Sequence, residues 1–179
     1  MAKVLLWNSL STRRRSTSDT FLENGLGRLK AYLESSGHEV VLEDWATDSF
    51  YSELTVPLIT RPLRTLYKLL LFRQGGDLPP ALKKLFGAGT VVFQEIQSFV
   101  LRRRMESHIR SLARTIPQKG FQVIGMKLWY GEAFHWAKKL ARILQETAPE
   151  LLVVAGGYHV TLYEEDVLRF GPFDLGVRG

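Results

Sequence analysis

The chain has 179 residues, of which 45% are hydrophobic and 23% are charged, and this fits one globular domain or one domain with an elaboration. It contains no cysteine, which excludes disulfides, thiolate zinc sites, iron–sulfur ligation and cysteine nucleophiles within this sequence and suits a reducing cytoplasm. The formal net charge is +6, and two arginine runs, at 13–15 and 102–104, hold much of the excess.

The first predicted element is a strand over 4–8 (VLLWN), because a continuous apolar run that ends in a polar residue is typical of a central parallel strand. A polar loop over 9–18 follows. Thr20 and Glu23 then have the spacing of a capping box, which indicates the start of a helix. The apolar stripe of this helix consists of Leu22, Leu26, Leu29 and Leu33.

Gly37 is the expected stop of this first helix, since glycine accepts the backbone conformation that commonly ends helices. The segment 39–45 (EVVLEDW) is the second predicted strand. A strand–helix–strand unit of about forty residues predicts parallel strands joined by a right-handed crossover.

The same alternation of strands and helices returns in the last third of the sequence. Its predicted elements are a strand over 122–129, a helix with a stripe of Ala133, Trp136, Leu140, Ile143 and Leu144, a strand over 151–155, a short helix over 163–170 and a short strand over 174–177. Together these elements predict an α/β fold, a doubly wound flavodoxin-like or Rossmann-like sheet of five parallel strands.

The segment 47–120 is too long for a single crossover helix, and Pro57, Pro62, Pro79 and Pro80 divide it into pieces. Its last piece has a helical stripe formed by Val92, Ile96, Phe99, Met105, Ile109, Leu112 and Ile116. We interpret this piece as the ordinary second crossover helix, preceded by a helical insertion over about 47–90. The whole chain is then one domain, 1–179, that carries this insertion.

The arginine runs have two interpretations: they are solvated faces, or they bind a phosphate-bearing ligand, an acidic partner or nucleic acid. The first apolar run, 4–7, is too short for a secretory signal, and no segment has the about 18 uninterrupted apolar residues of a membrane span. The sequence gives no clear nucleic-acid or membrane signal, and we expect a cytoplasmic protein.

Ligands of open α/β sheets bind beyond the carboxyl ends of the strands, where the strand order changes direction. Four loops of this sequence start there. The candidate binding residues are Asn8, Ser9, Leu10, Asp44, Lys127, Leu128, Trp129, Gly156, Gly157, Tyr158 and His159. No catalytic residue and no protein metal ligand is predicted among them.

Several of these candidates have a structural alternative that the sequence leaves open. Gly156 and Gly157 let a ligand approach the backbone closely, or they make a tight turn. His159 contacts a ligand, or it fixes the loop by a local hydrogen bond. Asp44 meets a ligand hydroxyl or amide, or it caps the following segment. The acidic run 164–166 is interpreted as helix N-terminal acids.

Five phrases of the sequence, KVLLWNSL, SGHEVVLEDW, VIGMKL, PELLVVAGGYHVTLYEE and FDLGVRG, resemble the N-terminal cobalamin-binding-type domain of radical S-adenosylmethionine enzymes. The resemblance covers 3–45 and 121–179. Its most specific part is Ala155 to Thr161, in which two glycines, a variable residue, His, another residue and Thr follow a strand. The family's phrase after the last strand continues as VRGEGE, and this sequence stops at VRG, as a chain cut before the radical domain would.

The resemblance implies that this chain binds a corrinoid, cobalamin, whose cobalt carries a methyl group or mediates electron transfer. An absent C-terminal radical domain of the same polypeptide would add a [4Fe-4S] cluster and S-adenosylmethionine, so this chain alone is not expected to be catalytic. The cobalt would lack a protein histidine ligand, since no histidine follows the first strand. Lys127-Leu128-Trp129 departs from the family's Ser-x-Leu element, which puts contacts to the nucleotide tail in doubt.

Two other hypotheses remain open. The N-terminal half of a two-domain glycosyltransferase explains the first 45 residues, including GHEV, but neither the double glycine with His and Thr nor the closing DLGVRG. A non-enzymatic interaction domain that uses its basic helices to bind nucleic acid or a membrane explains the arginine runs. Aromatic residues are not interleaved with those arginines, as base stacking would require.

Overall fold

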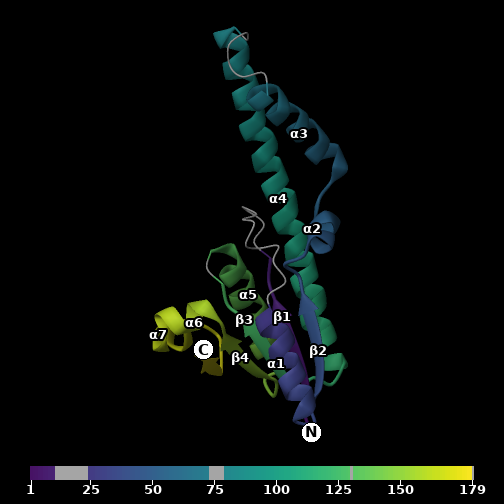
Figure 1. The fold of residues 1–179 in the computed structure, drawn as a ribbon, viewed down its shortest axis with the longest axis vertical. Helices are drawn as coiled ribbons and strands as arrows, with labels where there is room; N and C mark the ends of the chain where they lie inside the picture. Colours follow the sequence, from purple (N-terminus) through teal and green to yellow (C-terminus); the bar gives the residue numbers. More distant parts are fainter. Residues whose placement is uncertain (11–23, 73–78, 130, 179) are drawn as a thin grey trace. The chain divides into compact units, whose positions relative to one another are not determined.

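The computed structural model describes residues 1–10, 24–72, 79–129 and 131–178. The chain forms two compact units (Figure 1). Unit 1 comprises Met1–Tyr51 and Glu106–Gly179, and unit 2 comprises Ser52–Met105.

Unit 1 contains a five-stranded sheet in which every pair of neighbouring strands is parallel. The strands are β1 (Lys3–Asn8), β2 (Glu39–Asp44), β3 (Val123–Lys127), β4 (Leu152–Gly156) and β5 (Leu175–Val177), in the order β2-β1-β3-β4-β5. This is the strand order of flavodoxin-like folds. The predicted fold class is therefore confirmed, with strand ends that differ from the predicted ones by one or two residues.

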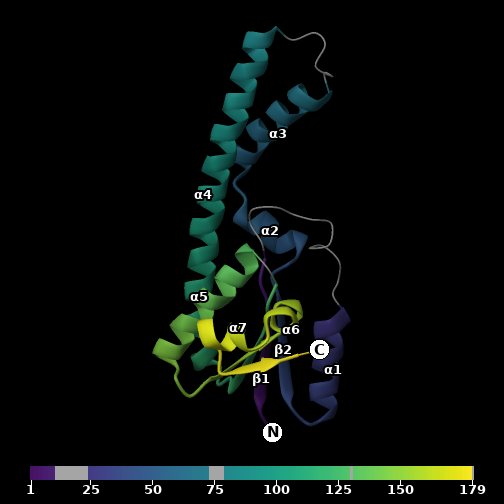
Figure 2. The ribbon, with the colours of Figure 1, turned by 90° about the vertical axis from the view of Figure 1, so that its left-hand side faces the viewer.

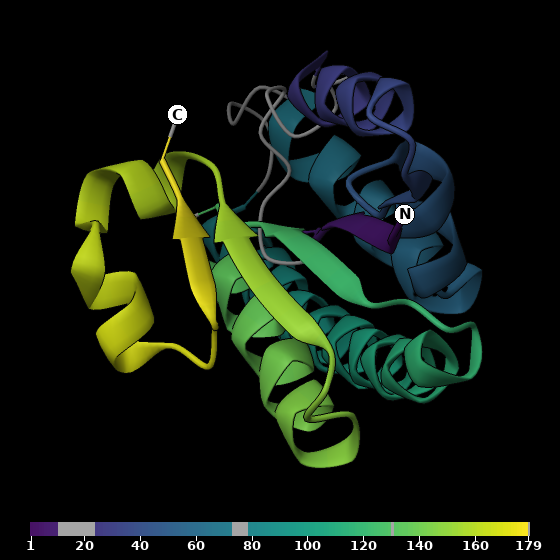
Figure 3. The same cartoon turned by 90° about the horizontal axis from the view of Figure 1, so that it is seen from below.

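Helices cover the two faces of the sheet unequally (Figure 3). On one face, α1 (Asn24–Ser35) packs Leu26 and Leu33 against a cluster that includes Val4, Leu6 and Val40. Leu29, expected in the same stripe, is 43% exposed. The predicted capping box at Thr20 and Glu23 lies outside the described residues.

The other face is covered by α5 (Glu132–Thr147) and by the last part of α4 (Pro80–Gln118), residues 106–118 (Figure 3). Its buried strand residues are Leu5, Trp7, Ile124, Met126, Val153 and Ala155, and the buried residues of α5 are Ala133, Trp136, Ala137, Leu140, Ala141 and Leu144. A fully buried large apolar side chain contributes about 1.5–3 kcal/mol, so this face holds most of the hydrophobic stabilisation of unit 1.

The first face is left open over the last two strands, β4 and β5. Because side chains alternate along a strand, Leu152, Val154, Leu175 and Val177 share the face of α1, and three of them are 38% to 57% exposed. In the described part of the chain, no helix lies over them. We call these four residues the open face; they adjoin Gly156 at the end of β4.

The crossover between β4 and β5 contains two short helices, where a single helix over 163–170 was expected. They are α6 (Tyr158–Tyr163) and α7 (Glu165–Phe170). The expected helix corresponds to α7, which begins two residues later than predicted, whereas α6 was not expected. Glu164 between them has φ 45°, a left-handed conformation that separates the two helices. The Glu164 carboxylate is 3.0 Å from Nη1 of Arg178, which fixes this corner to the strand that follows.

Unit 2 is helical, as expected for this part of the sequence. It contains α3 (Pro57–Phe72), which runs alongside the first part of α4, and the end of α2 (Asp48–Leu54) (Figures 1 and 2). Nη1 of Arg104 donates to the carbonyls of Glu53 and Thr55, at 2.9 and 3.1 Å. Among the described residues, no helix meets the length and hydropathy of a membrane span.

The predicted apolar stripe of the long helix divides into two parts. Met105, Ile109, Leu112 and Ile116 are buried, whereas Val92, Ile96 and Phe99 are 44% to 60% exposed. The predicted helical spacing is therefore confirmed over the whole stripe, but only its second part is buried. Helical spacing alone gives no information about where along a 39-residue helix the partners are.

An ion pair joins the two helices on the buried face of unit 1. The Glu106 carboxylate accepts hydrogen bonds from Nζ of Lys139 and, at 3.1 Å, from Nη2 of Arg110. These hydrogen bonds lower the pKa of Glu106 from its ordinary value, and the bond from Lys139 has the larger effect. Ionised Glu106 therefore stabilises the folded state at neutral pH, and this contribution disappears as the pH falls through the lowered pKa.

We expect Glu106→Gln to lower the free energy of unfolding at pH 7 by up to about 1 kcal/mol, because the pair is partly exposed. The difference from the wild type should shrink as the pH falls and vanish below the lowered pKa of Glu106, where the carboxyl group binds a proton in both the folded and the unfolded protein. Urea unfolding at pH 7 and pH 3.5 measures it. Glu146→Gln on α5 is the control, since the described part of the chain offers Glu146 no ion-pair partner, and an equal loss in both variants would contradict the prediction.

Candidate functional site

The carboxyl ends of four strands form one continuous row. The strand register places Asn8 beside Asp44 on one side and beside Lys127 on the other, and Lys127 beside Gly156. We call Asp44, Asn8, Lys127 and Gly156 the carboxyl edge. The strand order changes direction between β1 and β3, so the switch point lies between Asn8 and Lys127. The structure thus brings together residues that are up to 148 positions apart in sequence, from three different predicted loops and the double glycine.

At one end of this row, Asn8 and Asp44 lock two strands together. Nδ2 of Asn8 donates to Oδ1 of Asp44 at 2.9 Å, and the backbone N–H of Ala46 donates to the same oxygen at 2.9 Å. The backbone N–H of Trp45 donates to the Asn8 carbonyl at 3.0 Å. Asp44 therefore has the capping contact that the sequence left as one of two alternatives, and its carboxylate has a fixed orientation.

Ser9 follows Asn8 directly and is 5% exposed. Its Oγ is buried and has no hydrogen-bond partner in the described part of the chain. A buried hydroxyl without a partner costs about 1–3 kcal/mol, so an arriving acceptor or donor would regain that energy. The neighbouring Leu10 is 1% exposed and belongs to the buried hydrophobic core.

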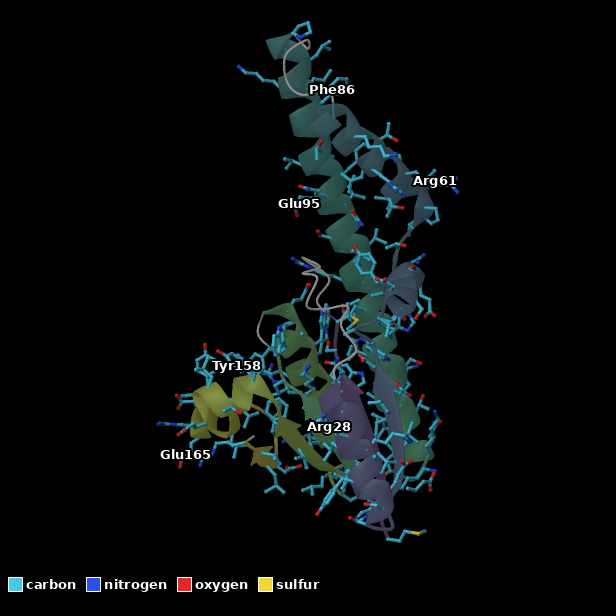
Figure 4. All side chains as sticks on the ribbon, viewed as in Figure 1. Arg28, Arg61, Phe86, Glu95, Tyr158 and Glu165 are labelled. Atoms are coloured by element: carbon cyan, nitrogen blue, oxygen red, sulfur yellow. The ribbon has the colours of Figure 1, made fainter. Side chains whose placement is uncertain are left out.

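In the middle of the row, a cation and two aromatic rings cluster. Nζ of Lys127 lies 5.0 Å from the centroid of the Trp129 ring, and the Trp129 and Tyr158 rings are 5.7 Å apart. Tyr158 is 52% exposed and is the first residue of α6 (Figure 4). Leu128 between them is fully buried, and its N–H donates to the Gly156 carbonyl at 2.7 Å. This part of the edge presents positive charge and flat apolar surface together.

The two glycines after β4 have different constraints. Gly157 has φ 94°, and a Cβ there would lie 3.2 Å from the Leu128 carbonyl oxygen, so this position requires glycine for the turn itself. Gly156 has no such constraint, because its Cβ would approach only the Val177 carbonyl, at 3.9 Å. The tight-turn interpretation therefore explains Gly157, whereas Gly156 leaves space at the edge that the fold does not need.

His159 lies on the α5 side of the sheet. Its ring is 4.3 Å from that of Phe134 and 4.5 Å from that of Tyr163, measured between centroids, and its backbone N–H donates to the Leu128 carbonyl at 3.4 Å. Burial lowers the pKa of His159, so the imidazole is neutral at pH 7. Nδ1 is buried without a hydrogen-bond partner among the described residues. These contacts hold the histidine in an aromatic stack.

An aromatic cluster next to the carboxyl edge was not expected from the sequence. The Trp45 ring stacks on Phe50 at 4.6 Å and meets the edge of Trp7 at 5.2 Å, and His108 of α4 lies against both Trp45 and Phe50. The only signal in the sequence was Trp45 at the end of a strand. This cluster gives rigid support to the β1 and β2 ends of the edge.

The B12 binding domain family matches residues 98–179. The match covers β3, β4 and β5, the helices between them and the end of α4, whereas β1 and β2, which complete the same sheet, lie outside it. The match thus includes the second part of the resemblance, 121–179, and leaves out its first part, 3–45. No curated protein and no solved structure is significantly similar to the chain.

Proposed function

We propose that unit 1 is a corrinoid-binding module that holds cobalamin at its carboxyl edge. The observation that carries the proposal is the coincidence of a B12 binding domain match with a row of ligand-competent groups at the switch point of the sheet. That place is where open parallel sheets bind cofactors. When bound, the corrinoid would supply a cobalt that carries a methyl group or transfers electrons.

The residues of the edge fit the chemistry of a corrinoid. A corrin ring is a broad, flat apolar plane fringed with amides, which need both donors and acceptors. Asp44 and Ser9 offer acceptors and a donor, and Lys127 offers a cation beside the Trp129 and Tyr158 rings. Gly156 leaves space in this row, and the open face beside it presents exposed apolar side chains that a corrin ring could cover.

The cobalt has no histidine of the first loop to bind, because residues 9–23 contain none. His159 is held in its aromatic stack with Phe134 and Tyr163, which supports a structural role for it. We therefore propose that the carboxyl edge would hold cobalamin without a protein histidine on the cobalt.

As a finer proposal, this module belongs to a radical S-adenosylmethionine enzyme of the cytoplasm. The support is the run Ala155 to Thr161 and the closing VRG, which resemble that family. In this proposal a C-terminal domain brings the [4Fe-4S] cluster and S-adenosylmethionine for methyl transfer or related chemistry. The chain here binds and orients the corrinoid, and it holds no catalytic residue of its own.

Titration of the chain with hydroxocobalamin, followed by visible absorption and calorimetry, tests the proposal. We expect saturable 1:1 binding with a spectrum that reports water, or the cofactor's base, on the cobalt. A spectrum with a protein imidazole on the cobalt would contradict the ligand assignment. No binding at high micromolar concentration would overturn the proposal for this chain.

A further inference from the structure

Within unit 2, the helix α4 carries a stripe of apolar side chains that are exposed to solvent. We define this apolar stripe as Leu82, Leu85, Val92, Ile96 and Phe99, which are 39% to 64% exposed. Their spacings of three, seven, four and three place them on one side of the helix, with Gly89 filling the gap. Large exposed apolar patches on soluble proteins mark interaction surfaces.

The apolar stripe is separate from the side of α4 that unit 2 buries. That buried or half-buried side comprises Phe86, Thr90, Phe93, Gln97 and Leu101. With 3.6 residues per turn, the two sides lie roughly a third of a turn apart around the helix. The internal packing of unit 2 therefore does not use the stripe.

Unit 2 also carries the entire net charge of the protein. Residues 52–105 hold nine Lys and Arg against three Asp and Glu, which gives +6, while the remaining residues hold fifteen of each and are neutral. On α3, the exposed Arg61, Arg64 and Lys68 recur at helical spacing, and Arg61 lies on the outer side of the helix (Figure 4). On α4, the guanidinium of Arg103 lies 5.3 Å from the centre of the Phe99 ring.

We propose that unit 2 docks onto an anionic lipid surface, with the apolar stripe buried among the headgroups and the basic residues beside lipid phosphates. A helix that lies in the plane of a bilayer combines these two properties, exposed apolar residues on one side and Lys or Arg nearby. Each basic residue close to an anionic leaflet adds to the attraction. This inference concerns unit 2 alone and does not depend on corrinoid binding in unit 1.

A second copy of the chain fits the stripe less well. Two units that each carry +6 repel one another, whereas an anionic bilayer attracts both. The stripe from Leu82 to Phe99 also spans about two and a half heptads, fewer than the three to four that a stable coiled coil requires, and glycine interrupts it. Nucleic acid would use the charge but would leave the aliphatic residues uncovered.

The test is sedimentation of the full chain with vesicles of phosphatidylcholine alone and with about one third phosphatidylglycerol. We expect at least about tenfold tighter binding to the anionic vesicles, and weaker binding in about 0.5 M salt, where surface charges are screened. Equal binding to both vesicle types, or binding to neither, would overturn the proposal. A concentration-dependent dimer without vesicle binding would assign the stripe to a second copy instead.

Leu85→Glu/Phe99→Glu places two charges in the middle of the stripe and should abolish vesicle binding. Leu162→Glu/Phe170→Glu is the matched control, because it changes a leucine and a phenylalanine of similar exposure in unit 1 and should leave binding unchanged. Circular dichroism verifies that both variants fold. Binding that survives in the first variant, or is lost equally in the second, would overturn the role of the stripe.

A charge variant keeps the test decisive if the first variant does not fold. Arg61→Gln/Arg64→Gln/Lys68→Gln should weaken vesicle binding about tenfold to hundredfold, while Arg28→Gln/Arg114→Gln/Arg142→Gln, with the same loss of charge in unit 1, should have little effect. Since the chain has no cysteine, Val92→Cys also accepts a single environment-sensitive dye. Its emission should shift to the blue with anionic vesicles, and an unchanged emission would contradict burial of the stripe.

Discussion

Gly156→Val should weaken hydroxocobalamin binding by at least about a hundredfold while the sheet stays folded, each tenfold being about 1.4 kcal/mol. The fold accepts this change because a Cβ at this position meets only the Val177 carbonyl, at the ordinary contact distance of 3.9 Å. The valine side chain would instead occupy space at the carboxyl edge, between Lys127 and the end of β5. Calorimetric titration measures the affinity, and circular dichroism measures the fold.

Two further glycine variants serve as comparisons for Gly156→Val. Gly157→Val should destabilise the protein as well, because φ 94° and the nearby Leu128 carbonyl strain any larger residue. Gly120→Val, with φ 70° before the start of β3, carries a similar backbone strain at the opposite edge of the sheet and should leave affinity unchanged. Unchanged affinity in folded Gly156→Val would remove the carboxyl edge from the proposed function.

Trp7→Ala should lower the free energy of unfolding by about 3–5 kcal/mol, the usual cost of removing a large buried aromatic side chain. Trp7 is fully buried on β1 and meets Trp45 edge to face at 5.2 Å. Its Nε1 has no hydrogen-bond partner in the described part of the chain, so Trp7→Phe loses no hydrogen bond and should cost much less. Urea denaturation measures both variants.

Trp129→Ala separates this structural role from binding. Trp129 is half-buried at the carboxyl edge, beside Lys127 and Tyr158, and its removal should change stability little. The same variant should reduce corrinoid affinity if the ring contacts the ligand. A large loss of stability in Trp129→Ala, or a small loss in Trp7→Ala, would contradict the structural role assigned to Trp7 and the binding role assigned to Trp129.

The strands and their parallel direction were predictable from the sequence, because strands that are buried in a parallel sheet are continuous apolar runs. The segments at 4–8 and 151–155 are such runs; the glycines at 156–157 mark the end of the second run, and Gly37 marks the end of the first helix. The right-handed crossover rule then leaves few possible topologies. Local patterns in the sequence were sufficient to predict the strands, because the apolar runs coincide with the strands of the sheet.

Other features depend on contacts that no local pattern contains. The helix α6 was not predicted, and the left-handed backbone of Glu164 separates it from α7, which was. The exposure of Val92 and Phe99 depends on which side of a long helix finds a partner, and both sides of α4 have apolar spacing. At the site, the sequence placed Asn8 and Asp44 in the same region, but the hydrogen bond between them required the strand register.

That hydrogen bond has an entropic consequence for any ligand of Asp44. A free aspartate samples several rotamers, and a ligand that fixes one of them loses part of its binding free energy to that ordering. In this protein, Nδ2 of Asn8 and the N–H of Ala46 already hold Oδ1, so the rotamer is selected when the chain folds. The carboxylate thus meets its ligand with little conformational freedom left to lose, and binding there would show a smaller entropic penalty than at a mobile surface aspartate.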